Sequence, residues 1–232
     1  LAEHDNGVTN FHFEISADLL DEEELSLFRK MRPGLIQLET GVQTANPRTL
    51  QEIRRKTDLN RIREMTLRIH RFQNIHQHLD LIAGLPWEDK ESFLNSFDQV
   101  YAMRPDQLQL GFLKVLKGSF MEEQKEAYGL TFTERPPFEV LSTRWLSYAD
   151  VLELKRIEEM VEVYYNSGQF SNTIKQMEGF FPRPARMFQE LGEWHEQMGL
   201  RDMGHSRLAR YENLFRFLAE RFPDEGDLFR DA

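Results

Sequence analysis

Polar side chains occupy alternate positions of four short segments, and these are the residues that could bind a ligand. They are His12, Glu14, Ser16, Gln37, Glu39, Gln43, His78, Asp80, Gln107 and Gln109. The interior of a parallel barrel is usually packed with Val, Ile and Leu. A strand face that is polar instead predicts a wet cavity that holds a ligand. The alternative is a one-sided sheet whose polar face meets solvent, and periodicity alone leaves both open.

Three other chemistries can be weighed from the residue types. His76, His78 and Asp80 share one parity, and two imidazoles with a carboxylate can form a metal site. The chain has no cysteine, which excludes disulfides, thiolate ligands and a Cys nucleophile within it. No ordered nucleophile–base pair occurs, which disfavours a conventional barrel hydrolase. Arg54 and Arg55 can equally be solvated helix surface.

Helical patterns alternate with the four segments, and this order predicts an α/β fold with a parallel sheet. We expect strands over residues 8–17, 35–42, 76–83 and 107–115, and helices over about 22–31, 47–56, 61–72 and from Asp89 onward. The expected helix caps are Asp18 or Asp21, Asn46, Asp58 or Asn60, and Asp89. In such folds, ligand sites lie just past the carboxyl ends of the strands.

Charge and hydropathy restrict the partners. The net charge of −10 argues against nucleic acid, although residues 54–71 are locally basic. No run approaches the roughly eighteen apolar residues that a membrane helix needs. The N-terminus lacks the features of a signal peptide, so we expect no membrane partner and a cytoplasmic location.

The strand pattern ends after Lys117. Helical patterns follow over residues 122–127, 148–165, 171–180, 186–197 and 205–221, with an irregular stretch around Pro136-Pro137. We therefore expect two domains, an α/β domain over residues 1–117 and a mostly helical domain over residues 118–232.

Three motifs in this order resemble the later strands of a radical S-adenosylmethionine (SAM) enzyme. They are FHFEI, LETGVQTANPRTLQEIRRKT and HLDLIAGLPWED. The series GVQ…R…DLIxGLP is most similar to the branch that contains oxygen-independent coproporphyrinogen oxidase. Downstream, RPPFEVLST and VEVYYNSGQF resemble an uncharacterised C-terminal domain of radical SAM proteins that carry an N-terminal cobalamin-binding domain.

The resemblance implies a fold and a reaction class. The chain would carry the last strands of a partial (β/α) TIM-like barrel, followed by an all-α domain. The cofactors would be SAM and a 4Fe–4S cluster held by a CxxxCxxC loop, with cobalamin left open. The chemistry would be methyl transfer or oxidative rearrangement through a 5′-deoxyadenosyl radical. Because this chain has no cysteine, we expect its partner to be a missing N-terminal region of the same protein, without which it is inactive.

By the same resemblance, five positions would contact SAM. Glu14 matches a carboxylate near the methionine end, where an acceptor suits an ammonium group. Gln43 matches a polar contact, and Arg55 an arginine whose fork pairs with the cofactor carboxylate. Asp80 would accept from the ribose hydroxyls. Gly84, having no Cβ, would let the backbone approach the adenine.

Some alternatives remain open at this point. The matching arginine could be Arg54 if the register slips by one residue. Glu39 shares the polar face and is a candidate contact on the substrate or cluster side. A non-catalytic α/β binding or scaffold module is the rival function. The edge of the first strand would be open unless a missing piece covers it, which predicts a homodimer through that edge.

Overall fold

The computed structural model describes residues 2–201 and 203–225, which divide into two compact units between Leu154 and Lys155. The parallel strands lie in the first unit together with residues 118–154. The packing boundary therefore lies further along the chain than the change in sequence pattern. The division into domains over residues 1–117 and 118–232 stays a prediction.

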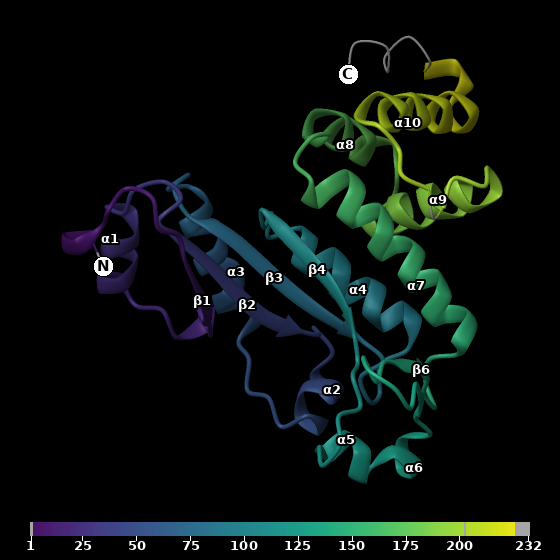
Figure 1. Ribbon diagram of the computed structural model, residues 1–232, viewed down its shortest axis with the longest axis horizontal. Coiled ribbons are helices and arrows are strands. Elements are labelled where there is room, and N and C mark those ends of the chain that lie inside the picture. The colour runs from purple at the N-terminus through teal and green to yellow at the C-terminus, as the bar shows by residue number, and fades with distance from the viewer. Residues whose placement is uncertain (1, 202, 226–232) are drawn as a thin grey trace. The chain divides into compact units, whose positions relative to one another are not determined.

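A four-stranded parallel sheet forms the centre of the first unit, in the spatial order β1-β2-β3-β4 (Figure 1). Its strands are β1 (Phe11–Ile15), β2 (Ile36–Gln43), β3 (His76–Ala83) and β4 (Gln107–Phe112). The predicted α/β class and parallel pairing are confirmed. The described strands form an open sheet, and the barrel stays a prediction.

Helices cover the apolar face of this sheet. The apolar side chains of the strands pack there against the apolar side of each helix. Figure 1 shows α3 and α4 along one face of the strands. The helices are α1 (Glu22–Arg29), α3 (Leu59–His70) and α4 (Lys90–Tyr101). Buried apolar side chains include Ile36, Leu38, Leu79, Leu81, Ile62, Met65, Ile69, Phe93, Phe97 and Val100. Each such side chain contributes roughly 1.5–3 kcal/mol when fully buried, so this layer is the main source of stability.

The helix caps follow the sequence closely. Asp21 accepts from the backbone N–H of Glu24, and the Glu24 side chain accepts from the backbone N–H of Asp21, which completes a capping box. Asn46 caps the short helix α2 (Pro47–Glu52), Asp58 caps α3 and Asp89 caps α4. These contacts confirm the expected caps. Asp21 rather than Asp18 caps α1, and Asp58 rather than Asn60 caps α3.

The strand β1 differs from the other three in its exposure. It is an edge strand among the described residues, and Phe13 on its apolar parity is 38% exposed. The rings of Phe11 and Phe13 stack on each other with centroids 6.3 Å apart. Alternating apolar residues therefore did not guarantee burial at this edge of the described sheet.

The remainder of the first unit lies largely beyond the carboxyl ends of the strands, where Figure 1 shows α2, α5 and α6. The elements are α5 (Phe120–Glu123), α6 (Lys125–Tyr128), β5 (Thr131–Phe132) and β6 (Val140–Ser142). β5 and β6 form an antiparallel pair where the sequence predicted an irregular stretch. The prediction was wrong there: Thr131 pairs with Ser142 and Phe132 pairs with Val140. Val140 N–H also donates to Leu113 O at 2.8 Å, which ties this pair to the segment after β4.

After Leu154, every regular element of the described residues is helical. The elements are the remainder of α7 (Tyr148–Met160), a π-helical segment η3 (Val161–Asn166), α8 (Ser171–Met177), η4 (Glu178–Phe180), α9 (Pro184–Gln197), α10 (Arg207–Arg221) and η5 (Pro223–Glu225). Short 3-10 turns also occur near the N-terminus, at η1 (Ala2–His4) and η2 (Ala17–Leu19). No helix among the described residues is long and apolar enough to cross a membrane.

Tyr164 and His195 form a buried polar contact in the core of the second unit. The Tyr164 hydroxyl lies 3.0 Å from Nε2 of His195. Burial lowers the pKa of His195 to about 4, so the imidazole is neutral at pH 7. His195 is therefore a buried core histidine with a polar partner.

Candidate functional site

A polar pocket of about 360 Å³ opens at the carboxyl-terminal part of β1, β2 and β3. Its lining residues are Glu14, Ile15, Ser16, Glu39, Gly41, Gln43, Arg55 and Asp80. Four of the five predicted contacts therefore lie in one pocket, although 66 residues of sequence separate Glu14 from Asp80. Glu39 lies there too, and Gly84 does not.

The strand register brings the carboxylates together. Glu14 pairs with Glu39 across β1 and β2, and Gly41 pairs with Asp80 across β2 and β3. Paired residues of parallel strands point to the same face, so all three carboxylates lie on one side of the sheet. Gly41 leaves space beside Asp80, because a Cβ there would collide with Nε2 of Gln43.

A bulge turns Gln43 toward the pocket. The register with β3 shifts between Gly41 and Gln43, and Gln43 has a positive φ of 70°. Such a φ is uncommon for a residue other than glycine, and bulges often re-aim a side chain next to a site. The side-chain amide folds back over Gly41 as a result.

Arg55, rather than Arg54, lines the pocket. Its Nη2 donates to the carbonyl oxygen of Gly41 at 2.5 Å. The guanidinium has further N–H groups that this hydrogen bond does not use. The guanidinium of Arg54 lies 5.2 Å from the ring of Phe120 instead. The structure thus gives each arginine a separate place, and the cofactor role of Arg55 stays a prediction.

A row of acids and imidazoles crosses the pocket wall. Nε2 of His12 lies 2.8 Å from Oε2 of Glu39, and Glu39 and Asp80 both line the pocket. Burial raises the pKa of Glu39, and the hydrogen bond and charge of Asp80 raise it further, against the opposing effect of His78 and His12.

His78 and Asp80 form a close but poorly aligned contact. Nε2 of His78 lies 3.0 Å from Oδ1 of Asp80. Both atoms are buried, and neither has a partner with hydrogen-bond geometry, so we treat the contact as an ion pair. The Asp80 carboxylate raises the pKa of His78, and burial acts in the opposite direction.

These side chains suit a small ligand of mixed charge. Three carboxyl groups can accept from ammonium or hydroxyl groups, and one guanidinium can hold a carboxylate. The metal alternative has no support in the described residues, where no group of three or more His, Asp and Glu side chains could hold a metal ion. His76 is exposed at the start of β3, away from the pocket lining.

Gly84 follows β3 and has a packing role of its own. Its φ is +90°, and a Cβ at this position would lie 2.7 Å from Cγ1 of Val140 on β6. The positive φ and the closeness of Val140 both require glycine at this position. The predicted approach of its backbone to an adenine ring stays a prediction.

Comparison with known proteins gives two matches of different kinds. Residues 126–232 match a family described as "Protein of unknown function (DUF4080)". No curated protein matches the chain. Among solved structures, the chain is similar to coproporphyrinogen III oxidase (HemN) from Escherichia coli, a radical SAM enzyme, with 20% sequence identity and a TM-score of 0.48. The match covers 65% of this chain and 32% of that one, so this chain spans about a third of the length of HemN.

The sequence reasoning missed a buried acid behind the pocket. Glu88 is 1% exposed, and its Oε1 accepts from the hydroxyls of Thr44 at 2.5 Å and Ser96 at 3.1 Å. Burial raises the pKa of Glu88 to about 7. Thr44 directly follows Gln43, so this acid connects the loop after β2 with the loop after β3. No periodicity marks it, and only its place after the GLP turn could have drawn attention.

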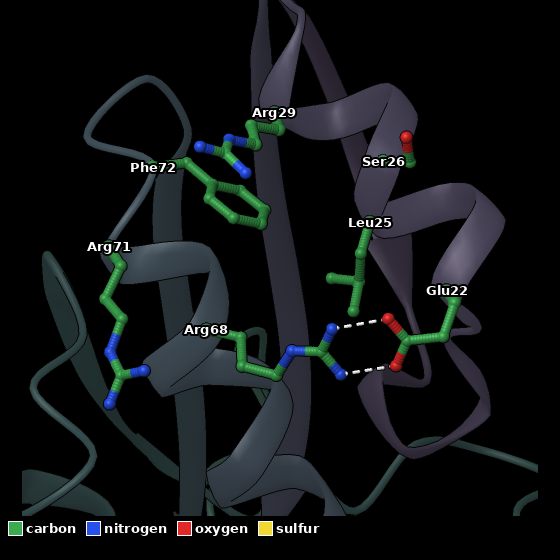
Figure 2. Close-up of a pocket in the computed structure, with 7 residues that line it drawn as sticks. All are labelled: Glu22, Leu25, Ser26, Arg29, Arg68, Arg71 and Phe72. Atoms are coloured by element: carbon green, nitrogen blue, oxygen red, sulfur yellow. Dashed lines mark hydrogen bonds and ion pairs between the residues drawn. The ribbon is translucent and has the colours of Figure 1, made fainter.

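A second pocket, of about 300 Å³, lies between α1 and α3 (Figure 2). Its lining residues are Glu22, Leu25, Ser26, Arg29, Arg68, Arg71 and Phe72. Figure 2 shows the Arg68 fork donating twice to the Glu22 carboxylate, at 2.6 Å for each contact. None of the predicted site residues lines this pocket. Part of the basic stretch is thus used in contacts between helices.

Proposed function

We propose that this chain is part of a radical SAM enzyme and that its polar pocket binds the methionine and ribose parts of SAM. The observation that carries the proposal is the convergence of Glu14, Gln43, Arg55 and Asp80 on one pocket. These are the positions that the motif resemblance selected before any spatial information entered, and unrelated surface residues would have no reason to meet.

The chemistry of the pocket fits this ligand. SAM carries an ammonium and a sulfonium, both positive, and one carboxylate. Glu14 would accept from the ammonium, and Arg55 would hold the carboxylate. Asp80 would accept from the ribose hydroxyls, because its carboxylate lines the pocket. The excess of acid over base in the lining suits a ligand with net positive charge.

The iron–sulfur cluster does not fit the residues of this chain, because the chain has no cysteine and cluster ligation needs thiolates. We therefore propose that a further region of the same protein holds it. In such enzymes the cluster and SAM together supply a 5′-deoxyadenosyl radical. Methyl transfer or oxidative rearrangement, with cobalamin as a further cofactor, is proposed only for that longer protein.

SAM binding is the direct test. We would measure it by calorimetry for the wild-type protein and for Asp80→Asn and Arg55→Ala, with Glu23→Gln as a control on the exposed side of α1. Loss of a hydrogen bond to a charged group costs about 1.5–3 kcal/mol, so each pocket variant should bind about 10- to 150-fold more weakly. Unchanged affinity in both pocket variants would refute the site assignment.

A non-catalytic binding or scaffold module is the second candidate, favoured by the absence of cysteine. The enzyme and the binding module can be distinguished by testing the protein together with the region encoded upstream of this chain. Release of 5′-deoxyadenosine from SAM under reductant, after reconstitution without oxygen, would support the enzyme. SAM binding without any cleavage and without a CxxxCxxC upstream would support the module.

A further inference from the structure

Aromatic side chains from the segment after β3 and from residues 118–154 form a cluster outside the polar pocket. The ring centroids of Trp87 and Trp145 lie 4.6 Å apart, and those of Trp145 and Tyr128 lie 5.9 Å apart. Tyr128 and Trp145 belong to the part of the chain that matches the family of unknown function, yet both lie in the first unit. The start of that match therefore packs with the elements that carry the polar pocket.

Glu52, the last residue of α2, is the point where this cluster meets the helix. The Tyr128 hydroxyl donates to Oε1 of Glu52 at 2.5 Å, and Nε1 of Trp87 donates to Oε2 at 3.1 Å. These hydrogen bonds lower the pKa of Glu52, and the bond from Tyr128 has the larger effect. Both carboxylate oxygens of Glu52 are thus engaged by donors from outside α2.

The helix α2 is held to the segment after β3 by further contacts. The Thr49 hydroxyl donates to the carbonyl oxygen of Pro86 at 2.8 Å. The guanidinium carbon of Arg48 lies 3.4 Å from the ring centroid of Trp87, which is a cation–π contact. A helix of six residues is too short to be stable by itself. The place of α2 therefore depends on these contacts.

The end of α2 determines where Arg55 begins. Arg54 N–H donates to the carbonyl oxygen of Gln51 at 3.1 Å, and Arg55 N–H donates to that of Leu50 at 2.9 Å. Arg54 has a positive φ of 54°. Together these features form a Schellman motif, with Arg54 at the position that glycine usually occupies. The backbone of Arg55 is thus fixed to α2, and its side chain reaches the polar pocket from there.

We propose that Tyr128 is a positioning residue for the polar pocket: through Glu52 it fixes the end of α2, and so the place from which Arg55 holds the carboxylate of the ligand. The ligand part of this proposal rests on the proposed function. Tyr128 lies in the region that matches the family of unknown function, so this proposal gives the start of that region a role at the site.

The support matters because Arg55 has little of its own. Arg55 is exposed, so packing does not hold its side chain. A guanidinium pairs with a carboxylate through two bonds only when its planar fork is correctly oriented. A small shift of α2 would therefore weaken that pairing without removing the charge.

Hydrogen exchange of the free protein, followed by NMR, tests the positioning without a ligand. Tyr128→Phe removes the hydroxyl and keeps the ring, so the Arg55 amide should exchange about tenfold faster, the effect of losing a hydrogen bond to a charged group. The Lys30 amide at the end of α1 is the internal reference and should change little. Tyr148→Phe removes a hydroxyl from a residue that is 53% exposed and should leave both amides unchanged.

Calorimetry tests the ligand step with a double-mutant cycle. Tyr128→Phe should weaken SAM binding by about fivefold, less than Arg55→Ala, because the arginine is displaced rather than removed. In the Arg55→Ala protein, adding Tyr128→Phe should change the affinity by less than about twofold, since the residue through which it acts is gone. A contribution to stability alone would produce no such coupling.

A second variant covers poor folding of Tyr128→Phe. Glu52→Gln changes the same contact from α2, and an amide offers one acceptor oxygen to the two donors, Tyr128 and Trp87. It should therefore accelerate exchange of the Arg55 amide and weaken SAM binding in the same way, again only while Arg55 is present.

The possible failures are distinguishable. Unchanged exchange of the Arg55 amide in both Tyr128→Phe and Glu52→Gln would overturn the positioning role and leave the proposed function intact. An equal loss of SAM affinity with and without Arg55 would show that Tyr128 does not act through that residue. A wild-type protein that binds no SAM would overturn the proposed function and the ligand part of this proposal, while the exchange data would still decide whether Tyr128 positions Arg55.

Discussion

Arg55 is the one basic residue in the lining of the polar pocket, where it faces the acids Glu14, Glu39 and Asp80. Its position is set by a hydrogen bond to the backbone of Gly41, next to the bulge that turns Gln43. Its neighbour Arg54 packs on Phe120 and does not line the pocket. Adjacent residues of the same type thus have separate environments, and substitution can separate their roles.

Arg55→Lys should weaken SAM binding by about tenfold while changing the free energy of unfolding little. A lysine keeps the charge but loses the planar fork that pairs with a carboxylate through two bonds. The side chain is exposed, so its loss removes little packing. Calorimetry measures the affinity, and Arg54→Lys is the matched control. If Arg54→Lys were the variant that lost affinity, the motif register would be shifted by one residue.

At the scale of elements, the loops after β2 and β3 are tied together by buried polar contacts. Glu88 accepts from Thr44 and Ser96, and Asn46 donates to the carbonyl oxygen of Trp87 at 3.1 Å. Oε2 of Glu88 is buried without a hydrogen-bond partner. These contacts position the segment from Gln43 to Arg55 against β3, and they make it sensitive to the protonation of one acid.

Glu88→Gln should change how stability depends on pH. The folded pKa of about 7 lies above the ordinary value of 4.5, so the folded chain binds more protons than the unfolded chain between these values. The free energy of unfolding therefore falls as pH rises through this window. The neutral amide removes that dependence, so between pH 5 and pH 8 the variant should gain about 2–3 kcal/mol relative to wild type.

Urea denaturation of both proteins at the two pH values measures this difference. The comparison across pH cancels any pH-independent cost of placing an amide there. Thr44→Val would test the same contact from the other side, because it removes a donor to Glu88. A difference between wild type and Glu88→Gln that stays constant with pH would show that Glu88 titrates normally in the folded state.

Gly84→Ala should destabilise the first unit strongly. The alanine would be strained at a φ of +90°, and its Cβ would lie 2.7 Å from Val140. Strain and overpacking each cost about 1–3 kcal/mol. Gly118→Ala is the matched control, since Gly118 has a φ of +75° and nothing within 4 Å of the added Cβ. In denaturant titration Gly84→Ala should lose clearly more stability than Gly118→Ala; equal losses would mean that Val140 moves aside freely.

For the molecule as a whole, β1 is the surface where association is expected. It is an edge of the described sheet and carries Phe13 at 38% exposure. An exposed apolar edge strand is a template for pairing with another chain. We therefore propose that this chain associates with a second copy through β1 when no further segment covers that edge.

Phe13→Lys should shift that association toward monomer, because a charge on an edge strand opposes edge-to-edge pairing. Light scattering of the 232-residue chain over a range of concentrations measures it. Leu19→Lys adds the same charge at an exposed residue outside the strands and should have little effect. A wild-type chain that stays monomeric at high concentration would count against pairing through β1.

The sequence by itself determined the features that depend on neighbouring residues. Alternating polarity marked β2, β3 and β4, and Asp21, Asn46, Asp58 and Asp89 marked helix starts, because strand parity and capping are local effects. The order of strands and helices was enough for the α/β class and the parallel sheet. The motif series selected residues that lie together in the structure, although periodicity alone had left a cavity and a solvated face as equal alternatives.

Only the tertiary structure decided which of those residues meet and what surrounds them. The meeting of Glu14, Glu39 and Asp80 in one pocket depends on register between strands far apart in sequence. The separate places of Arg54 and Arg55 depend on contacts with Phe120 and with the backbone of Gly41. The contact that requires glycine at residue 84 lies on the β5–β6 pair, which no local pattern marked. Burial of Glu88 likewise comes from packing between two loops. Charge and packing at such sites are set by non-local neighbours, which a single sequence does not identify.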